Sequence, residues 1–324
     1  MEKREVSLKI FRFNPEVDRE PYYDRFDIAI DRGVTLLRAL MYIKNTLEPR
    51  LTFRAFCRAG ICGTCGVRLN GKPVLACKTQ LWKEFDRYDT TELQVDPLDN
   101  FPVIRDLVID LNPMEEKLKK MNSYLVPAEE GSDFQGETRM SPEELEEFEF
   151  TTSCILCNLC LSSCSVVPVD DTYIGPLFLA KAFRFASDKR DAERDRKVEL
   201  ALENGLWSCT HCNACLDACP TQTKPLKAIV RLRKKVVREQ RDQSVGSRRA
   251  RQYASDIYRY GQVNKVMLSY HVDHSKKSLR QYFKEWKKIL GHEWFLFKRK
   301  KFLLPFPQKV KGLQIVRQLM TLKK

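Results

Sequence analysis

The feature that most constrains this chain is the placement of its 12 cysteines, which all lie between Cys57 and Cys219. They form three regularly spaced groups of four, and no cysteine lies outside the groups. Structural cysteines at unrelated positions would leave strays, so the spacing predicts three sites with four thiolate ligands each. The chain after Cys219 contains no cysteine and contributes no thiolate.

The first group has the spacing C-x4-C-x2-C-x11-C and consists of Cys57, Cys62, Cys65 and Cys77. This spacing is typical of plant-type ferredoxins, which hold a 2Fe-2S cluster. Gly60, Gly63 and Gly66 fit a loop that turns tightly and brings backbone N–H groups close to the cluster. A zinc site and disulfides are the alternatives. Zinc sites usually pair two short C-x2-C motifs, and disulfides are not expected in a chain without an export signal.

The second and third groups share the spacing C-x2-C-x2-C-x3-C; they are Cys154, Cys157, Cys160 and Cys164, then Cys209, Cys212, Cys215 and Cys219. Bacterial ferredoxins have this spacing, and in them the fourth cysteine of each run binds the other cluster. We therefore expect Cys219 to complete one 4Fe-4S site with Cys154, Cys157 and Cys160. Cys164 then completes the other 4Fe-4S site with Cys209, Cys212 and Cys215.

Three iron-sulfur clusters in one chain predict an electron relay between two redox partners, because such clusters transfer single electrons without protons. The sequence contains no G-x-G-x-x-G dinucleotide motif and no arrangement of Ser, His and Asp or of paired carboxylates that indicates catalysis. We expect no catalytic residue on this chain and place the substrate chemistry on another subunit.

The remaining sequence predicts a mixed architecture. Apolar alternation at Val6, Leu8 and Ile10, and again at Phe26, Ile28 and Ile30, indicates two neighbouring strands. Thr35 is expected to cap a helix that ends before Pro49. Further along, Ser141 and Glu144 form a capping-box pattern around Pro142. A helical stretch from about Pro176 to Leu206 separates the second and third cysteine groups. An amphipathic helix beginning at Pro225 has Leu226, Ile229, Val230, Val236 and Val237 on one face.

These signals predict an α+β chain in four segments. Residues 1–101 form a plant-type 2Fe-2S ferredoxin domain, and residues 102–140 form a proline-containing polar linker. Residues 141–240 form an all-helical, bacterial-ferredoxin-like domain that holds the two further clusters. Residues 241–324 form a basic, aromatic-rich helical extension.

Charge is distributed unevenly along the chain. Residues 224–324 contain 28 Lys and Arg against 6 Asp and Glu, a net of +22, and the whole-chain net of +14 leaves −8 for residues 1–223. Trp286, Trp294 and Phe295 lie among the cations of the tail. This mixture suits an anionic membrane surface, at about 1 kcal/mol per Lys or Arg near the surface. Packing on the chain itself or on a partner is the alternative. Nucleic-acid binding is not expected, because the clusters already account for the chain.

The sequence contains no apolar run of about 18 to 20 residues, the length that a membrane span requires. The first residues, MEKREVSLKIFRFNPE, carry charges where a signal peptide has its apolar core. We expect the chain neither to span a membrane nor to carry its own export signal.

The order of the cysteine motifs resembles that of the iron-sulfur subunit of the succinate dehydrogenase and fumarate reductase family, over about residues 5–230. Five segments strengthen the resemblance: CRAGICGTCG, NGKPVLACKT, FPVIRDLVID, YIGPLFLAKAFRF and NGLWSC. It implies a β-grasp fold for the plant-type domain, which docks on a catalytic flavoprotein with covalent FAD. It also implies that the helical domain passes electrons to a quinone-linked membrane subunit.

Two positions depart from the family pattern. Most members have an apolar residue where this chain has Cys212, and they hold a 3Fe-4S cluster there. The extra thiolate predicts a 4Fe-4S cluster here, with 3Fe-4S as the form without Cys212. After Cys164, many relatives have Pro and aromatic residues that wall a quinone pocket, whereas this chain reads Ser165-Val166-Val167-Pro168. Both features resemble the methylmenaquinol:fumarate reductases, whose membrane-side subunit is cysteine-rich.

The resemblance implies a peripheral position on the cell membrane. The lack of a signal favours the cytoplasmic face, and export together with a twin-arginine flavoprotein would place the chain on the periplasmic face. An iron-sulfur subunit of a thiol-dependent fumarate reductase or other flavin oxidoreductase is the alternative function. A free-standing multi-cluster ferredoxin with a nucleic-acid-binding tail is a third hypothesis.

Overall fold

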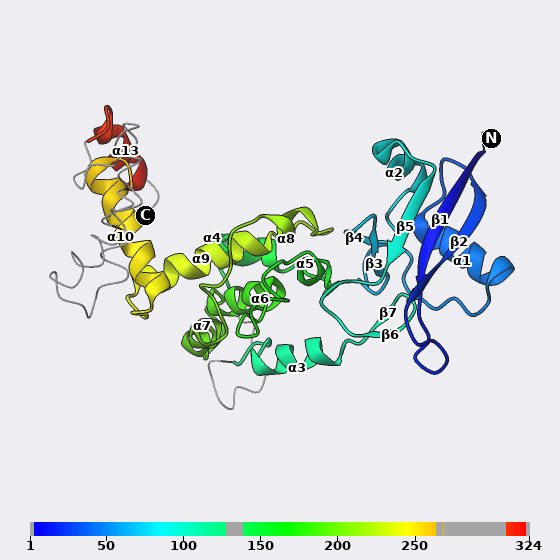
Figure 1. The fold of residues 1–324 in the computed structure, drawn as a ribbon. Coiled ribbons are helices and arrows are strands. Elements are labelled where there is room, and N and C mark those ends of the chain that lie inside the picture. The colour runs from blue at the N-terminus through cyan, green and yellow to red at the C-terminus, as the bar shows by residue number, and fades with distance from the viewer. Residues whose placement is uncertain (1–2, 128–138, 264–267, 269–308, 322–324) are drawn as a thin grey trace, which may run out of the picture. The chain divides into compact units, whose positions relative to one another are not determined.

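The computed structural model describes residues 3–127, 139–263, 268 and 309–321 (Figure 1). It divides the chain into two compact units, Met1–Leu232 and Arg233–Lys324. The first unit contains all the cysteines, and the second contains most of the basic tail.

The first unit begins with a five-stranded sheet whose strand order is β2-β1-β5-β3-β4. Its strands are β1 (Arg4–Arg12), β2 (Tyr22–Ile30), β3 (Gly66–Leu69), β4 (Lys72–Leu75) and β5 (Glu92–Asp96). Strands β1 and β2 pair antiparallel, so the prediction of two neighbouring strands is confirmed. β1 pairs parallel with β5, which makes the sheet mixed.

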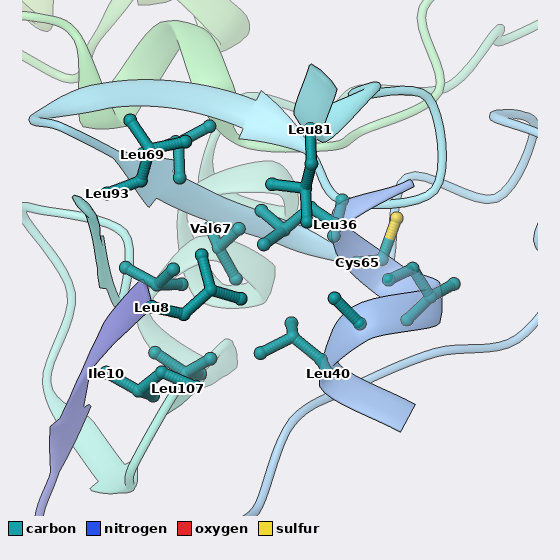
Figure 2. Close-up of a cluster of buried hydrophobic side chains, with 14 of the residues drawn as sticks. Leu8, Ile10, Leu36, Leu40, Cys65, Val67, Leu69, Leu81, Leu93 and Leu107 are labelled. Atoms are coloured by element: carbon teal, nitrogen blue, oxygen red, sulfur yellow. The ribbon is translucent and has the colours of Figure 1, made fainter. Parts of the chain in front are cut away.

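Helix α1 (Leu36–Tyr42) packs its apolar side against this sheet, and the predicted cap is confirmed because the Thr35 side chain accepts a hydrogen bond from Arg38 N. The helix continues as a π-helical turn (Ile43–Leu47) before Pro49. Helix α2 (Leu81–Tyr88) follows β4. Figure 2 shows Leu8, Leu36, Leu40 and Leu81 gathered in the core together with Cys65, so one cysteine lies at the inner edge of this core.

Part of the segment that the sequence analysis assigns to a linker packs on the first domain. It contains β6 (Val103–Arg105), β7 (Val108–Ile109) and α3 (Asn112–Lys120). Asp106 is buried and accepts hydrogen bonds from Arg12 Nε, Phe13 N and Thr52 N at 3.2, 3.0 and 2.8 Å. Buried polar groups need such partners, so this carboxylate fixes the segment to the sheet. Residues 128–138 lie outside the described residues.

The rest of the first unit is helical. Its helices are α4 (Pro142–Phe148), a 3₁₀ turn (Glu149–Thr151), α5 (Leu159–Ser162), α6 (Pro176–Ala186), α7 (Arg194–Glu203), α8 (Ala214–Asp217) and the start of α9 (Pro225–Arg238). The predicted capping box is confirmed, because Ser141 and Glu144 exchange both of its hydrogen bonds.

The stretch from Pro176 to Leu206 is helical as predicted, and it consists of two separate helices, α6 and α7. Asp188 lies in the break and is fully buried. Its carboxylate accepts from Arg184 Nη1 at 2.6 Å and from Arg190 N, Nε and Nη2 at 3.1, 2.8 and 2.7 Å. An Asp side chain that bonds the backbone two residues later competes with helix continuation, which accounts for the break.

Helix α9 begins at Pro225 as predicted, and Leu226, Ile229 and Val236 are buried. Val230 is 45% exposed, contrary to its assignment to the apolar face. The helical repeat of 3.6 residues places Leu232 on that face instead, and Leu232 is buried.

The second unit contains α10 (Val245–Tyr260) and α13 (Leu313–Thr321), which contact each other. Ser244 caps α10, and Gly261 ends it in the left-handed conformation with φ 77°. The aromatic residues predicted to meet a membrane or a partner, such as Trp286 and Trp294, lie outside the described residues. Among the residues that the structure describes, no helix combines the length and the apolar character needed to cross a lipid bilayer.

The charge network at Asp188 predicts a measurable contribution to stability. Burial opposes its charge, but bonds from Arg190 and Arg184 prevail and lower its pKa to about 2. A lowered pKa in the folded state stabilises the fold above the ordinary pKa near 4, and that stability is lost as the pH falls from about 4 to 2. Asp188→Asn should therefore lower the free energy of unfolding by about 2 kcal/mol, equally from pH 8 to pH 5.

Denaturant unfolding followed by circular dichroism measures this difference. The control is Glu199→Gln, which removes an exposed pair with Arg196 and should change the free energy of unfolding by about 0.5 kcal/mol or less. Equal effects of the two substitutions would contradict a structural role for the buried carboxylate.

Candidate iron-sulfur cluster sites

The first site is formed by Cys57, Cys62, Cys65 and Cys77. Three of them lie in the loop before β3, and Cys77 lies two residues after the end of β4. The backbone N–H groups of Ala59, Ile61 and Cys62 donate to Cys57 Sγ at 3.4, 3.4 and 3.3 Å. These donors lower the pKa of Cys57 to about 6. The loop therefore stabilises a thiolate at this position before any metal is considered.

The other thiols of the first site lie against one another. Burial raises the pKa of Cys65 to about 12, and the neighbouring Cys77 and Cys62 add to its interactions. Cys62 also contacts Cys57 through their side chains. The structure thus brings together the four cysteines that the sequence groups here.

The middle site is a pocket lined by Cys154, Cys157, Cys160 and Cys219. Ile155, Leu177 and Ala180 give the pocket an apolar wall. Cys219 belongs to the third cysteine group and the other three to the second. The pocket therefore joins thiols of both groups, as the bacterial-ferredoxin pattern predicts. Burial raises the pKa of Cys157 to about 11 and holds the pKa of Cys160 well above its ordinary value.

The third site gathers Cys164, Cys209, Cys212 and Cys215. Burial raises the pKa of Cys215 to about 12, and the charges of the other three thiols raise it further. Cys164 and Cys215 are buried, whereas Cys212 is the exposed one among the 12 cysteines. The buried Tyr173 hydroxyl hydrogen-bonds to Cys209 and lies near Cys164 and Cys215. One edge of this site therefore faces the outside of the unit.

The three sites follow one another through direct contacts. In the loop of the first site, a Cβ on Gly63 would lie 2.7 Å from Ile155 O and 2.9 Å from Cys157 Cα, in the middle site. Asn100 Nδ2 donates to Leu161 O at 2.8 Å and to Cys164 O at 3.2 Å, which ties the first domain to α5. Cys160 in turn interacts with Cys215 of the third site.

Several polar residues at these sites cannot be identified from the sequence pattern. Thr221 and Thr223 lie beside Cys219, and Tyr173 lies beside Cys209. Asn158 lines the middle pocket, is 4% exposed and has no hydrogen-bond partner for Oδ1. The thiol sets, the apolar walls and these polar groups fit iron-sulfur clusters.

Within the described ranges, no group of three or more His, Cys, Asp or Glu side chains is placed to hold a metal ion.

The close approach at Gly63 predicts a substitution effect with a matched control. Gly63 and Gly71 both have left-handed backbones, with φ 71° and 76°, but a Cβ on Gly71 would meet nothing within 4 Å. Gly71→Ala should cost only backbone strain, about 1 to 2 kcal/mol. Gly63→Ala adds a clash with the middle-site loop and should lower the thermal unfolding midpoint clearly further, as followed by circular dichroism. Equal shifts in the two variants would show that the two loops do not pack as described.

Comparison with known proteins gives a consistent result. Residues 7–116 match the family described as "2Fe-2S iron-sulfur cluster binding domain", and residues 151–223 match "4Fe-4S dicluster domain". The chain is 36% identical over 235 residues to the fumarate reductase iron-sulfur subunit of Haemophilus influenzae, covering 69% of this chain and 90% of that one. It is 34% identical over 267 residues to the 8-methylmenaquinol:fumarate reductase iron-sulfur subunit of Wolinella succinogenes, covering 82% and 83%.

A solved structure also has the same fold. A chain of the Mycobacterium smegmatis Sdh1 complex in the apo form superposes with a TM-score of 0.65 at 24% identity, covering 75% of this chain and 99% of that one. The domain order, the cysteine sets and the relatives lead to one conclusion: this chain belongs to the iron-sulfur subunits of the fumarate reductase and succinate dehydrogenase family.

Proposed function

We propose that this chain relays electrons between a FAD-containing catalytic subunit and a quinone-linked membrane subunit of a fumarate reductase or succinate dehydrogenase complex. The observation that carries the proposal is the pocket in which Cys219 joins Cys154, Cys157 and Cys160. Thiols 59 or more residues apart in sequence converge there, as a two-cluster ferredoxin arrangement requires.

The ligand assignment follows the three thiol sets. In our proposal Cys57, Cys62, Cys65 and Cys77 hold a 2Fe-2S cluster in a plant-type, β-grasp domain. The middle set holds a 4Fe-4S cluster. Cys164, Cys209, Cys212 and Cys215 hold a second 4Fe-4S cluster. Bound clusters of these types accept and release single electrons without protons.

Contacts within the chain hold the three sites next to one another in a series. The Gly63 contact holds the first-site loop against the middle-site loop, with no side chain between them. Asn100 bonds the backbone of Leu161 in α5, which carries Cys160 of the middle site, and the backbone of Cys164 of the third site. Exposed Phe56 and Ile61 flank Cys57 and Cys62 at one end of the series, and exposed Cys212 lies at the other. We assign the first end to the flavoprotein and the second to the membrane-side subunit.

The subgroup is part of the proposal. Cys212 supplies a fourth thiolate at the third site, and the match to the Wolinella succinogenes subunit extends over 82% of this chain. These features support a methylmenaquinol:fumarate-reductase-like complex with a cysteine-rich membrane-side subunit. We propose a peripheral position on the cell membrane, with the basic tail contributing contacts to its anionic surface.

Isolation of the native complex tests the function. Affinity purification under anaerobic conditions should retain a flavin-containing subunit and a membrane-side subunit, and the complex should reduce fumarate with a quinol. A chain that purifies alone, without bound flavoprotein at physiological salt, would contradict the proposal.

The nature of the third cluster gives a separate prediction. Wild-type oxidised protein should lack an intense 3Fe-4S signal in electron paramagnetic resonance. Cys212→Ala should produce that signal, because only three thiolates then remain at the third site. The control is Thr210→Ala, a change at an exposed residue of the same loop, which should leave the spectrum unchanged. An intense three-iron signal in the wild type that survives anaerobic iron addition would contradict the assignment of Cys212.

A further inference from the structure

The middle site has an uneven distribution of hydrogen-bond donors. Thr223 N donates to Cys219 Sγ at 3.3 Å, and Thr221 Oγ1 lies 3.7 Å from the same sulfur. The hydroxyl groups of Thr221 and Thr223 are 2.8 Å apart. Thr223 N and the Thr221 hydroxyl therefore meet one sulfur, and the Thr223 hydroxyl lies against the Thr221 hydroxyl.

The available protons determine which group donates in each of these hydrogen bonds. A cluster-binding thiolate has no proton, so the Thr221 hydroxyl must donate to Cys219 Sγ. Its oxygen then accepts the proton of the Thr223 hydroxyl, which gives a chain from Thr223 through Thr221 to the sulfur. Hydrogen bonds in such chains polarise one another, and a low dielectric strengthens them. Thr223 is 2% exposed, so water does not compete with the inner end of the chain.

The surroundings of the other thiols in this pocket differ from those of Cys219. Its wall includes the apolar Ile155, Leu177 and Ala180. Burial raises the pKa values of Cys157 and Cys160. Burial acts on Cys219 too, but the bonds from Thr221 and Thr223 outweigh it and lower the pKa of Cys219. The loop thus stabilises negative charge at one ligand of this site.

We propose that the hydroxyl groups of Thr221 and Thr223 raise the reduction potential of the middle site by acting through Cys219 Sγ. The inference rests on the proposed function, in which this site holds a 4Fe-4S cluster. Reduction adds one electron and neither forms nor breaks a covalent bond. The added negative charge is shared with the ligand sulfurs, so donors aimed at a sulfur stabilise the reduced form more than the oxidised form.

The test is an anaerobic redox titration of the purified complex, followed by electron paramagnetic resonance. Thr221→Val removes the hydroxyl and keeps the shape of the side chain. It should shift the one-electron equilibrium of the middle cluster toward the oxidised form by up to about tenfold, which corresponds to about 59 mV. Thr223→Val should give a smaller fall in potential, because Thr221 keeps its own donor. Thr221→Ser keeps a hydroxyl and should restore the wild-type potential.

Thr151→Val is the control, since Thr151 is as buried as Thr223 and its hydroxyl donates to Phe148 O at 2.6 Å instead of to a sulfur. It should leave the potential unchanged. The Cys212→Ala protein identifies which four-iron signal belongs to the third site.

Unchanged middle-site potentials in Thr221→Val and Thr223→Val, with full signal intensity, would overturn the inference and leave the proposed function intact. If Thr221→Val fails to retain the cluster, Thr223→Val decides in the same way. A wild-type complex without a four-iron signal from this site would instead overturn the proposed function.

Discussion

The structure of the first unit depends on thiols that must meet from distant parts of the sequence. Cys219 has to reach Cys154, Cys157 and Cys160, and Cys164 has to reach the later run. Helices α6 and α7 lie between the two runs in sequence, and they must fold back for α5 and α8 to come into contact. The fold of the helical part is therefore tied to the cysteine cross-over.

The same constraint creates an electrostatic problem. Burial raises the pKa values of Cys157, Cys160 and Cys215, so the protein environment alone disfavours their charged forms. Metal ligation requires deprotonated thiols and supplies the compensating positive charge, which couples binding to folding. Hydrogen-bond donors lower the cost of a charged thiolate at three of the ligands. They are three N–H groups at Cys57, the Thr221 and Thr223 loop at Cys219, and Tyr173 at Cys209. Each site thus receives a different set of donors.

Sequence and structure agree where a local rule is strong. The β1 alternation, the Thr35 cap and the Ser141 capping box depend on neighbouring residues, and all three are confirmed. The thiol groups could also be predicted from the sequence, because the spacing of the cysteines reflects the geometry of a cluster site. Side-chain partners that depend on the tertiary fold could not be predicted in this way. Asp188 separates α6 from α7 through bonds to two arginines, and Thr223 becomes a sulfur neighbour only after the loop following Cys219 closes. No periodicity or spacing marks either residue.

The central claim is that one chain holds one two-iron and two four-iron clusters in series. Mössbauer spectroscopy of the purified complex, prepared with isotopically enriched iron, measures this most directly, since it distinguishes these cluster types and counts their iron. We expect one 2Fe-2S and two 4Fe-4S contributions. A three-iron component in place of the second 4Fe-4S cluster, or a cysteine group that holds zinc instead of iron, would contradict it.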